Sequence, residues 1–384
     1  MILIGDVREQ LKQLPDQSVN CVVTSPPYWG LRDYGTASWD GGDLNCDHQG
    51  KPMATKSNIN RNCGTGNDVK NAQAREFFKN ICGKCGAKRI DSQIGLEQTP
   101  EQYIEQMVLV FREVWRVLKN DGTLWLNLGD SYASFRDGKA TPDTTRKDSK
   151  GTLVPKGSAA NRMANSFAGS SIKHKDLVGI PWRVAFSLQQ DGWYLRQDII
   201  WHKPNPMPES VRDRCTKSHE YIFLLTKSPQ YYYDHQAIQE DAKTSPGATW
   251  KERKAAGATA GNVIVGDGVR NGTQRVVHGK GVTSNLTRQD GKRNKRSVWT
   301  VTTRPFKGAH FATFPPELIE PCILAGCPEG GTVLDPFFGA GTTGLVAQRH
   351  NRKWIGCELN PEYAAIAKAR IESESNLFTD RDSQ

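Results

Sequence analysis

The chain alternates between short apolar runs, typical of buried strands, and segments in which apolar residues recur every three or four positions, as on one face of a helix. Apolar runs predict strands at residues 2–5, 18–24, 123–128, 193–201, 221–226, 332–334 and 353–357. Helical spacing predicts helices at residues 7–14, 99–118, 181–190, 315–325, 343–350 and 361–373. Because strands and helices alternate, the pattern predicts an α/β fold with a mainly parallel sheet.

Three long stretches interrupt this alternation. Residues 36–92 show no periodicity and contain four of the nine cysteines. Residues 131–180 carry nine Lys and Arg against four Asp and Glu, and residues 241–300 carry twelve against four. Both basic stretches are rich in Gly, Ser, Thr and Asn, a composition typical of long loops. They are either solvated linkers or, since they flank regular elements, loops that contact phosphates.

Composition narrows the class of protein. A chain of 384 residues is long enough for two domains or for one large domain with insertions. The net charge of +10 favours a polyanionic partner, nucleic acid before membrane. No apolar run approaches the roughly 18 residues of a membrane helix, and the N-terminus lacks the basic region of a signal peptide. The odd number of cysteines argues for a reducing compartment, so we expect no membrane partner and a cytoplasmic location.

A glycine-rich loop joins a predicted strand to a predicted helix near the C-terminus. Residues 332–344, TVLDPFFGAGTTG, contain Gly339, Gly341 and Gly344 in a GxGxxG pattern, and Glu358 ends the next predicted strand. Glycines let the backbone approach a ligand, the helix start offers N–H groups, and a carboxylate at the next strand end can bind ribose hydroxyls. The spacing therefore favours a nucleoside-containing cofactor.

The residues before the glycines distinguish between cofactors. Asp335 at the strand end is expected to put a carboxylate in the crevice, where it would repel a pyrophosphate but suit an ammonium or sulfonium centre. Phe337 and Phe338 would pack against an adenosyl or amino-acid moiety, or alternatively belong to the core. These residues argue against a dinucleotide.

A rigid corner, Ser25-Pro26-Pro27-Tyr28, follows the second predicted strand. The two prolines fix φ and remove two N–H donors, while their carbonyls remain as acceptors. Such a corner suits an exocyclic amino group, with Ser25 adding a hydroxyl acceptor and Tyr28 a ring on which a base can stack. The alternative is a rigid turn with an exposed aromatic side chain.

Together the two motifs resemble those of the S-adenosylmethionine-dependent DNA amino-methyltransferases of the β group, in which the catalytic motif precedes the cofactor motif. The resemblance implies a Rossmann-like methyltransferase fold, circularly permuted, with a doubly wound sheet. It implies a catalytic domain of residues 1–35, 93–235 and 298–384, a cysteine-containing insertion at 36–92 and a basic target-recognition region at 236–297. The cofactor-binding residues that it implies are Asp6, His310, Phe311, Phe314, Asp335, Phe337, Gly339, Gly341, Thr342, Thr343 and Glu358.

The resemblance also implies the reaction. A base flipped out of double-stranded DNA would stack on Tyr28, while Ser25 and the carbonyl of Pro26 in the Pro26-Pro27 pair accept hydrogen bonds from its amino group. Residues 197–203 and 219–223 resemble motifs that shape the base pocket. Ser25 at the first motif position favours N4 of cytosine, with N6 of adenine as the alternative. The family includes solitary enzymes and enzymes of restriction-modification systems, so a cognate restriction endonuclease and a homodimer are the partners it allows.

Other functions fit the residues less well. Carbon-5 methylation of cytosine would need a nucleophilic cysteine after proline, and the pair Pro321-Cys322 lies in a predicted apolar helix. A nucleotide-dependent oxidoreductase would use the glycine motif but leaves the Ser25 corner and the basic loops unexplained. The intact glycines and Glu358 speak against a nucleic-acid-binding protein with a degenerate cofactor fold, and RNA as substrate has no specific support.

The cysteine-containing insertion carries a candidate zinc site. Cys46, His48, Cys82 and Cys85 are ligand-competent, and the last two have the spacing of a zinc knuckle. A tetrahedral zinc ion would close a polar segment that we do not expect to order by itself. Cys63 is an alternative ligand to His48, and metal-free thiols or a redox-active pair are the other interpretations.

Overall fold

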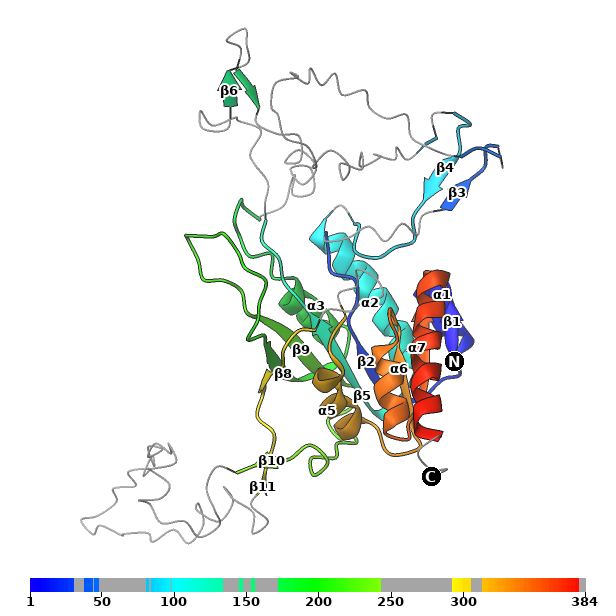
Figure 1. The fold of residues 1–384 in the computed structure, drawn as a ribbon, viewed down its shortest axis with the longest axis vertical. Helices are drawn as coiled ribbons and strands as arrows, with labels where there is room; N and C mark the ends of the chain where they lie inside the picture. Colours follow the sequence, from blue (N-terminus) through cyan, green and yellow to red (C-terminus); the bar gives the residue numbers. More distant parts are fainter. Residues whose placement is uncertain are drawn as a thin grey trace, which may run out of the picture.

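The computed structural model describes residues 1–30, 38–43, 45–47, 81–82, 84–97, 99–133, 145–147, 153–155, 172–242, 292–304 and 313–379. Its centre is an eight-stranded sheet (Figure 1). In spatial order the strands are β1 (Ile2–Ile4), β14 (Lys353–Glu358), β13 (Thr332–Asp335), β2 (Val19–Thr24), β5 (Leu118–Leu128), β9 (His219–Thr226), β8 (Tyr194–His202) and β12 (Val298–Thr300). Neighbouring strands run parallel except β9, which is antiparallel to β5 and β8. The predicted mainly parallel α/β sheet is therefore confirmed.

Helices cover both faces of this sheet and form two main cores (Figure 1). The first core contains side chains of α1 (Val7–Gln10), α2 (Pro100–Val117) and α3 (Ile180–Gln190), and the second those of α5 (Pro316–Gly326) and α6 (Thr342–Arg349). Helix α7 (Pro361–Thr379) packs Ala367 and Ile371 against Phe338 and Leu345, beside α6. Because both faces are covered, the central strands read as nearly continuous apolar runs.

Helix α2 shows how local sequence sets the start of an element. Thr99 Oγ1 accepts a hydrogen bond from the Gln102 N–H, and the Gln102 side chain accepts one from the Thr99 N–H. This capping box pairs N–H groups that the first turn would otherwise leave unpaired. The buried side of the helix carries Tyr103, Met107 and Phe111. Because the cap sets the residue at which α2 begins, it also sets where the Tyr103 side chain leaves the helix toward Pro27.

Some boundaries differ from the prediction. Residues 7–14 form α1 and then a 3-10 turn, η1 (Leu11–Gln13), instead of one helix. The turn ends at Leu14, whose backbone is extended because Pro15 disfavours helical backbone at the residue before it. Strand β5 begins at Leu118, which pairs with Val19 ahead of a register shift. The sequence does not predict β12, since it is three residues long and buries only Trp299.

Three antiparallel ribbons accompany the main sheet. They pair β3 (Ser38–Asp40) with β4 (Lys88–Ile90), β6 (Thr145–Lys147) with β7 (Leu153–Pro155), and β10 (Glu240–Asp241) with β11 (Lys292–Arg293). The last pair joins the two ends of the basic region through ion pairs of Asp241 with Lys292 and of Glu240 with Arg293. Residues 243–291 lie outside the described residues, so the target-recognition role of 236–297 stays a prediction.

Strands β2 and β13 lie side by side at the centre of the sheet, although they come from opposite ends of the chain. Cys21 pairs with Val333 and Val22 with Leu334. From β13 the chain continues through α6 to β14 on one side, and from β2 it continues through α2 to β5 on the other. Such a reversal of winding opens a crevice at the carboxyl ends of the strands. Both sequence motifs follow these two strands and therefore meet at this edge.

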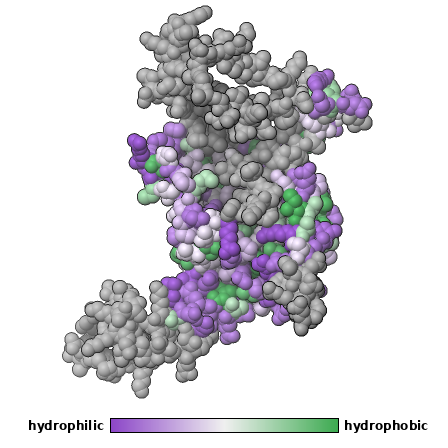
Figure 2. Space-filling model, viewed as in Figure 1, coloured by the Kyte–Doolittle hydropathy of each residue, from purple (hydrophilic) through white to green (hydrophobic). Residues whose placement is uncertain are grey.

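One face of the described part of the molecule is mostly polar (Figure 2). On the face shown in Figure 2, hydrophilic residues predominate and hydrophobic residues form small separate patches. Within the described ranges, no helix combines the length and the apolar character needed to cross a membrane.

Candidate active site

A cavity opens at the carboxyl ends of β1, β2, β13 and β14, where the winding of the sheet reverses. Most of the residues that line it lie at or directly after the ends of these strands, and the others lie before α2 and α5 or at the start of α1 and α7. They are Gly5, Asp6, Val7, Ser25, Pro26, Pro27, Tyr28, Ser92, Gln93, Ile94, Thr313, Pro336, Phe337, Gly339, Cys357, Glu358, Leu359, Asn360 and Tyr363. The proline corner and the glycine-rich loop therefore share one cavity.

The proline corner is held by a hydrogen bond from outside the motif. Tyr103 Oη donates to the Pro27 carbonyl at 2.9 Å. No residue in the described ranges donates a hydrogen bond to the Pro26 carbonyl, and neither proline has an N–H of its own. The Ser25 hydroxyl lies 3.4 Å from Tyr28 Oη. Within the described part of the chain, the Pro26 carbonyl and the Ser25 hydroxyl thus remain as acceptors.

The hydroxyl of Tyr28 is anchored on the sheet, which fixes its ring. Tyr28 Oη donates a 2.8 Å hydrogen bond to Glu220 Oε2 of β9 and lies 3.2 Å from Asn127 Oδ1 of β5. Glu220 also forms an ion pair with Lys203. Burial, followed by the negative charge of Glu220, raises the pKa of Tyr28 well above its usual value, so the phenol keeps its proton. A Cβ at Gly129 would lie 2.6 Å from Tyr28 Cε2, so only glycine leaves room for the ring there.

Glu358 connects the glycine-rich loop to the end of β14. Its Oε2 accepts a hydrogen bond from the Gly339 N–H at 2.8 Å, and its Oε1 accepts one from the Asn360 N–H at 2.9 Å. A carboxylate oxygen has a second acceptor site, so both can still bind a hydroxyl. Burial raises the pKa of Glu358. Gly339 has a φ of +50° and open space where a Cβ would lie, which leaves room for a ligand beside Glu358.

Asp6 follows β1 and lies next to the end of β14. The Gly5 N–H donates to the Glu358 carbonyl at 2.9 Å. The Asp6 carboxylate caps α1 by accepting from the Arg8 N–H at 2.9 Å, and it forms an ion pair with the Arg8 guanidinium. Burial acts to raise the pKa of Asp6, but the hydrogen bonds and charge of Arg8 outweigh it and hold this pKa below its usual value. Asp6 therefore brings an ionised carboxylate to the cavity.

Asp335 does not project into the crevice as the sequence led us to expect. The residue is 2% exposed. Its Oδ1 accepts hydrogen bonds from Thr24 Oγ1 at 2.6 Å and the Phe337 N–H at 3.0 Å, and its Oδ2 accepts one from Thr343 Oγ1 at 2.7 Å. Burial raises the pKa of Asp335 to about 6. Its three donors turn the carboxylate into the core, where it ties β2, β13 and α6 together.

Three more of the expected cofactor residues lie in the core and do not line the cavity. A Cβ at Gly341, whose φ is +75°, would lie 2.9 Å from Ala367 Cβ, so this glycine permits α6 to start against α7. Thr342 is 4% exposed, and its hydroxyl accepts from Arg370 at 3.0 Å. Thr343 is engaged with Asp335. Packing and local hydrogen bonds, which the motif alone does not reveal, explain these positions.

Of the described residues just before α5, only Thr313 lines the cavity. Phe314, expected there, is 9% exposed and packs into the second core. His310 and Phe311 lie outside the described residues.

One wall of the cavity carries no recognisable motif. Residues 92–94 lie between β4 and α2. The adjoining Gly95 accepts a 2.8 Å hydrogen bond at its carbonyl from the Gly30 N–H, and a Cβ there would lie 3.2 Å from the Tyr28 carbonyl. The sequence motifs also did not identify Asn127 as a site residue. The signal that could have revealed it is a polar residue within the apolar run LWLNL. Glu220 and Lys203 fall in segments that the resemblance assigned to the base pocket.

The expected metal ligands come together in part. The sulfur atoms of Cys46, Cys82 and Cys85 lie within 4.8 Å of one another. His48 and the alternative ligand Cys63 lie outside the described residues.

The fold and the cavity define a class of enzyme. A mainly parallel sheet whose reversal point brings a glycine-rich loop beside a Ser-Pro-Pro-Tyr corner agrees with the class that the two motifs resemble, the S-adenosylmethionine-dependent amino-methyltransferases. The chain belongs to the N6/N4 DNA methyltransferase family, since the family model, described as DNA methylase, matches residues 19–369.

Individual relatives agree with this assignment. The chain is 41% identical over 371 residues to the Type II methyltransferase M.Cfr9I of Citrobacter freundii, covering 96% of this chain and 87% of that protein. It is 41% identical over 370 residues to the Type II methyltransferase M.SmaI of Serratia marcescens, covering 96% of this chain and 90% of that protein. The solved structure of the PvuII DNA methyltransferase (cytosine-N4-specific) matches with a TM-score of 0.50 at 18% identity, covering 96% and 84%, which shows a shared fold.

Proposed function

We propose that this protein transfers a methyl group from S-adenosylmethionine to the N4 amino group of cytosine at a specific sequence in DNA. The observation that carries the proposal is the single cavity lined by both the Ser25–Tyr28 corner and the Gly339 loop. Methylation at N6 of adenine is the alternative, because both amino groups can use the same acceptors. Ser25, through the family resemblance, favours cytosine.

The residues around the glycine-rich loop fit S-adenosylmethionine. Pro336 and Phe337 offer apolar contacts, and Glu358 offers acceptors to ribose hydroxyls. The carboxylate of Glu358 favours a cationic ligand over a pyrophosphate, whereas the charge of Asp6 is compensated by Arg8. When bound, S-adenosylmethionine supplies an electrophilic methyl group on a sulfonium centre.

The corner residues account for activation of the amine. An exocyclic aromatic amine is a poor nucleophile because its lone pair is delocalised into the ring. The Pro26 carbonyl and the Ser25 hydroxyl would accept hydrogen bonds from the amine and stabilise the positive charge that develops on its nitrogen as the N–C bond forms. The bond between the methyl group and the donor sulfur would break at the same time and leave a neutral thioether. The methylated nitrogen would then release one proton to water.

Tyr28 would hold the base during this reaction. Because its hydroxyl is tied to Glu220, its ring is fixed where it lines the cavity. A flipped base stacked on this ring would keep its amino nitrogen in line with the methyl group. We place the recognition of the surrounding sequence in the basic region 236–297, and the Type II relatives support a role in a restriction-modification system beside a cognate endonuclease.

Nucleoside analysis tests the proposal. The full-length protein is incubated with double-stranded DNA and S-adenosylmethionine, and the DNA is digested and analysed by mass spectrometry. We expect N4-methylcytosine that depends on the methyl donor. N6-methyladenine would establish the alternative, and binding of NAD without any DNA methylation would contradict both.

A further inference from the structure

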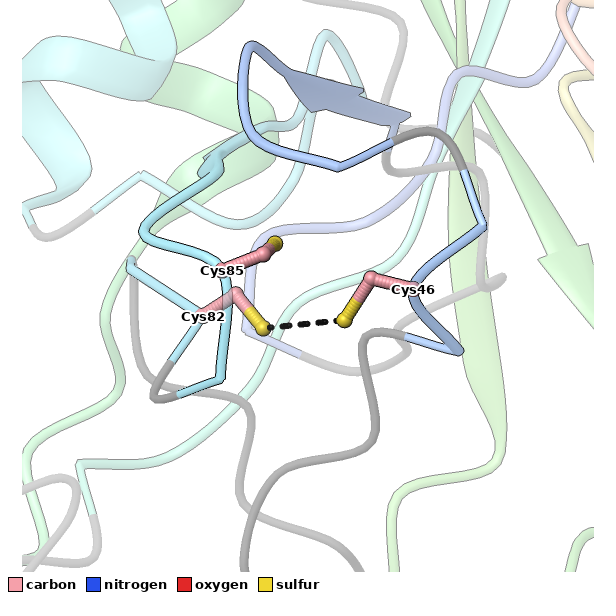
Figure 3. Close-up of side chains that lie close together, drawn as sticks. All are labelled: Cys46, Cys82 and Cys85. Atoms are coloured by element: carbon pink, nitrogen blue, oxygen red, sulfur yellow. Dashed lines mark hydrogen bonds between the residues drawn. The ribbon is translucent and has the colours of Figure 1, made fainter.

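We propose that Cys46, Cys82 and Cys85 bind a structural zinc ion next to the β3–β4 ribbon. Figure 3 shows the Cys46 and Cys82 side chains pointing toward each other, with Cys85 beside them. The three sulfur atoms lie within 4.8 Å of one another, and those of Cys46 and Cys82 are 3.8 Å apart. Cys46 follows β3, whereas Cys82 and Cys85 precede β4, so the cluster joins two segments that are distant in the sequence.

The spacing of the sulfur atoms suits a tetrahedral metal site. A disulfide requires a sulfur–sulfur distance of about 2.0 Å. Zinc–sulfur bonds of about 2.3 Å in a tetrahedron place neighbouring sulfurs about 3.8 Å apart. The Cys46–Cys82 separation matches this edge.

The turn between Cys82 and Cys85 has the backbone of a metal-binding knuckle. The Lys84 N–H points at Cys82 Sγ at 3.4 Å. The Cys82 N–H donates to the Ala87 carbonyl at 2.7 Å, and the Gly86 N–H donates to the Cys82 carbonyl at 3.0 Å. The turn thus orients the Cys82 sulfur.

Contacts other than the thiols bring the same two segments together. A Cβ at Gly42 would lie 2.7 Å from Cys85 Sγ, so the backbone after β3 approaches this sulfur closely. Lys84 forms a 2.6 Å ion pair with Asp47, next to Cys46. The close approach of the segments therefore does not depend on a single contact.

The ligand set selects the metal and predicts its fourth ligand. Three thiolates favour zinc over magnesium or calcium, which prefer oxygen ligands. A closed tetrahedral site needs one more donor. From the sequence alone, His48, two residues after Cys46, is the candidate and Cys63 is the alternative, and both lie outside the described residues.

The position of the cluster suggests what the zinc ion stabilises, an inference that rests on the proposed function. β4 ends at Ile90, and Ser92 already lines the cavity. Gly95 then packs against the carbonyl of Tyr28. By cross-linking Cys46 to Cys82, which are 36 positions apart in the sequence, the metal would offset the entropy lost in ordering this wall.

Metal analysis of the full-length protein, purified without chelators, tests the site. We expect about one zinc ion per chain, lost in Cys46→Ser and Cys82→Ser. Cys215→Ser, which changes an exposed cysteine outside the cluster, is the matched control and should keep its zinc. Loss of zinc in His48→Ala, with retention in Cys63→Ser, would identify His48 as the fourth ligand, and the reverse would identify Cys63.

Several outcomes would overturn the proposal. These are a protein that contains no zinc and binds none when zinc chloride is added, a Cys46–Cys82 disulfide in peptide mapping, and zinc retained by Cys82→Ser. If the serine variants fail to fold, cobalt substitution of the unaltered protein decides, since thiolate ligation gives a charge-transfer absorption band. Metal content does not depend on methylation, so failure of this proposal is distinguishable from failure of the proposed function.

Discussion

Thr24 and Asp335, the last residues of β2 and β13, are joined by a 2.6 Å hydrogen bond from Thr24 Oγ1 to Asp335 Oδ1. Thr343 Oγ1 donates to the other carboxylate oxygen at 2.7 Å. Ser25 directly follows Thr24, and Pro336 directly follows Asp335. This buried pair therefore sets the distance between the proline corner and the glycine-rich loop.

Replacing Asp335 with asparagine tests this pair through the pH dependence of stability. Burial raises the pKa of Asp335 from 3.8 to about 6, so the folded protein binds this proton more tightly than the unfolded chain. The stabilising contribution of the group is complete below about pH 4 and is lost as the pH rises through about 6. Over this pH interval, we expect the free energy of unfolding of the unaltered protein to fall by up to ~3 kcal/mol relative to that of D335N.

Urea unfolding of both proteins across this pH range checks the prediction. The asparagine side chain can accept from Thr24 and donate to the Thr343 hydroxyl, so the variant should fold. Parallel stability curves for the two proteins would show that Asp335 does not titrate as its burial implies.

Two substitutions at Tyr28 separate the ring from the hydroxyl. Tyr28→Ala removes the stacking surface and should lower kcat by about 100-fold or more, because the base is no longer held in line. Tyr28→Phe keeps the ring but loses the hydrogen bond to Glu220, so we expect a smaller loss of kcat and a loss of stability of ~1–3 kcal/mol. Methyl transfer and thermal unfolding of both variants provide the measurement, and equal loss of kcat would argue against a stacking role.

Pro26→Ala tests the rigidity of the corner. Alanine restores an N–H donor and frees φ, so the carbonyl acceptors lose their fixed position. We expect methyl transfer to be abolished while S-adenosylmethionine binding, measured by calorimetry, stays nearly unchanged. Pro15→Ala changes an exposed proline that does not line the cavity and is the control. Full activity of Pro26→Ala would refute the assignment of the corner.

Glu358→Gln tests the link between the glycine-rich loop and β14. A glutamine offers one acceptor oxygen in place of two, so either the Gly339 N–H or the Asn360 N–H faces a donor. We expect S-adenosylmethionine affinity to fall about tenfold, equivalent to ~1.4 kcal/mol.

The affinity for S-adenosylmethionine is measured by calorimetry. Glu329→Gln, which changes an exposed residue, is the control. If affinity is unchanged in Glu358→Gln, the carboxylate has no part in cofactor binding.

Local signals in the sequence predicted much of the fold. The spacing of Tyr103, Met107 and Phe111 together with the Thr99 cap placed α2 correctly, because periodicity and capping act within a few residues. Short β12 escaped prediction, since three residues with one buried side chain carry little pattern. The glycine and proline motifs were found because their residue types impose backbone geometry by themselves.

The sequence by itself determined the mainly parallel α/β order, the two motifs and the residues Ser25–Tyr28 and Gly339 that line the cavity. Only the tertiary structure decided that Asp335 turns into the core and that residues 92–94 form a cavity wall. The orientation of Asp335 depends on Thr24 and Thr343, and the wall depends on packing against residues 27–30. Such long-range contacts leave no periodic or local signal along the chain, because their energy is realised only when distant segments meet.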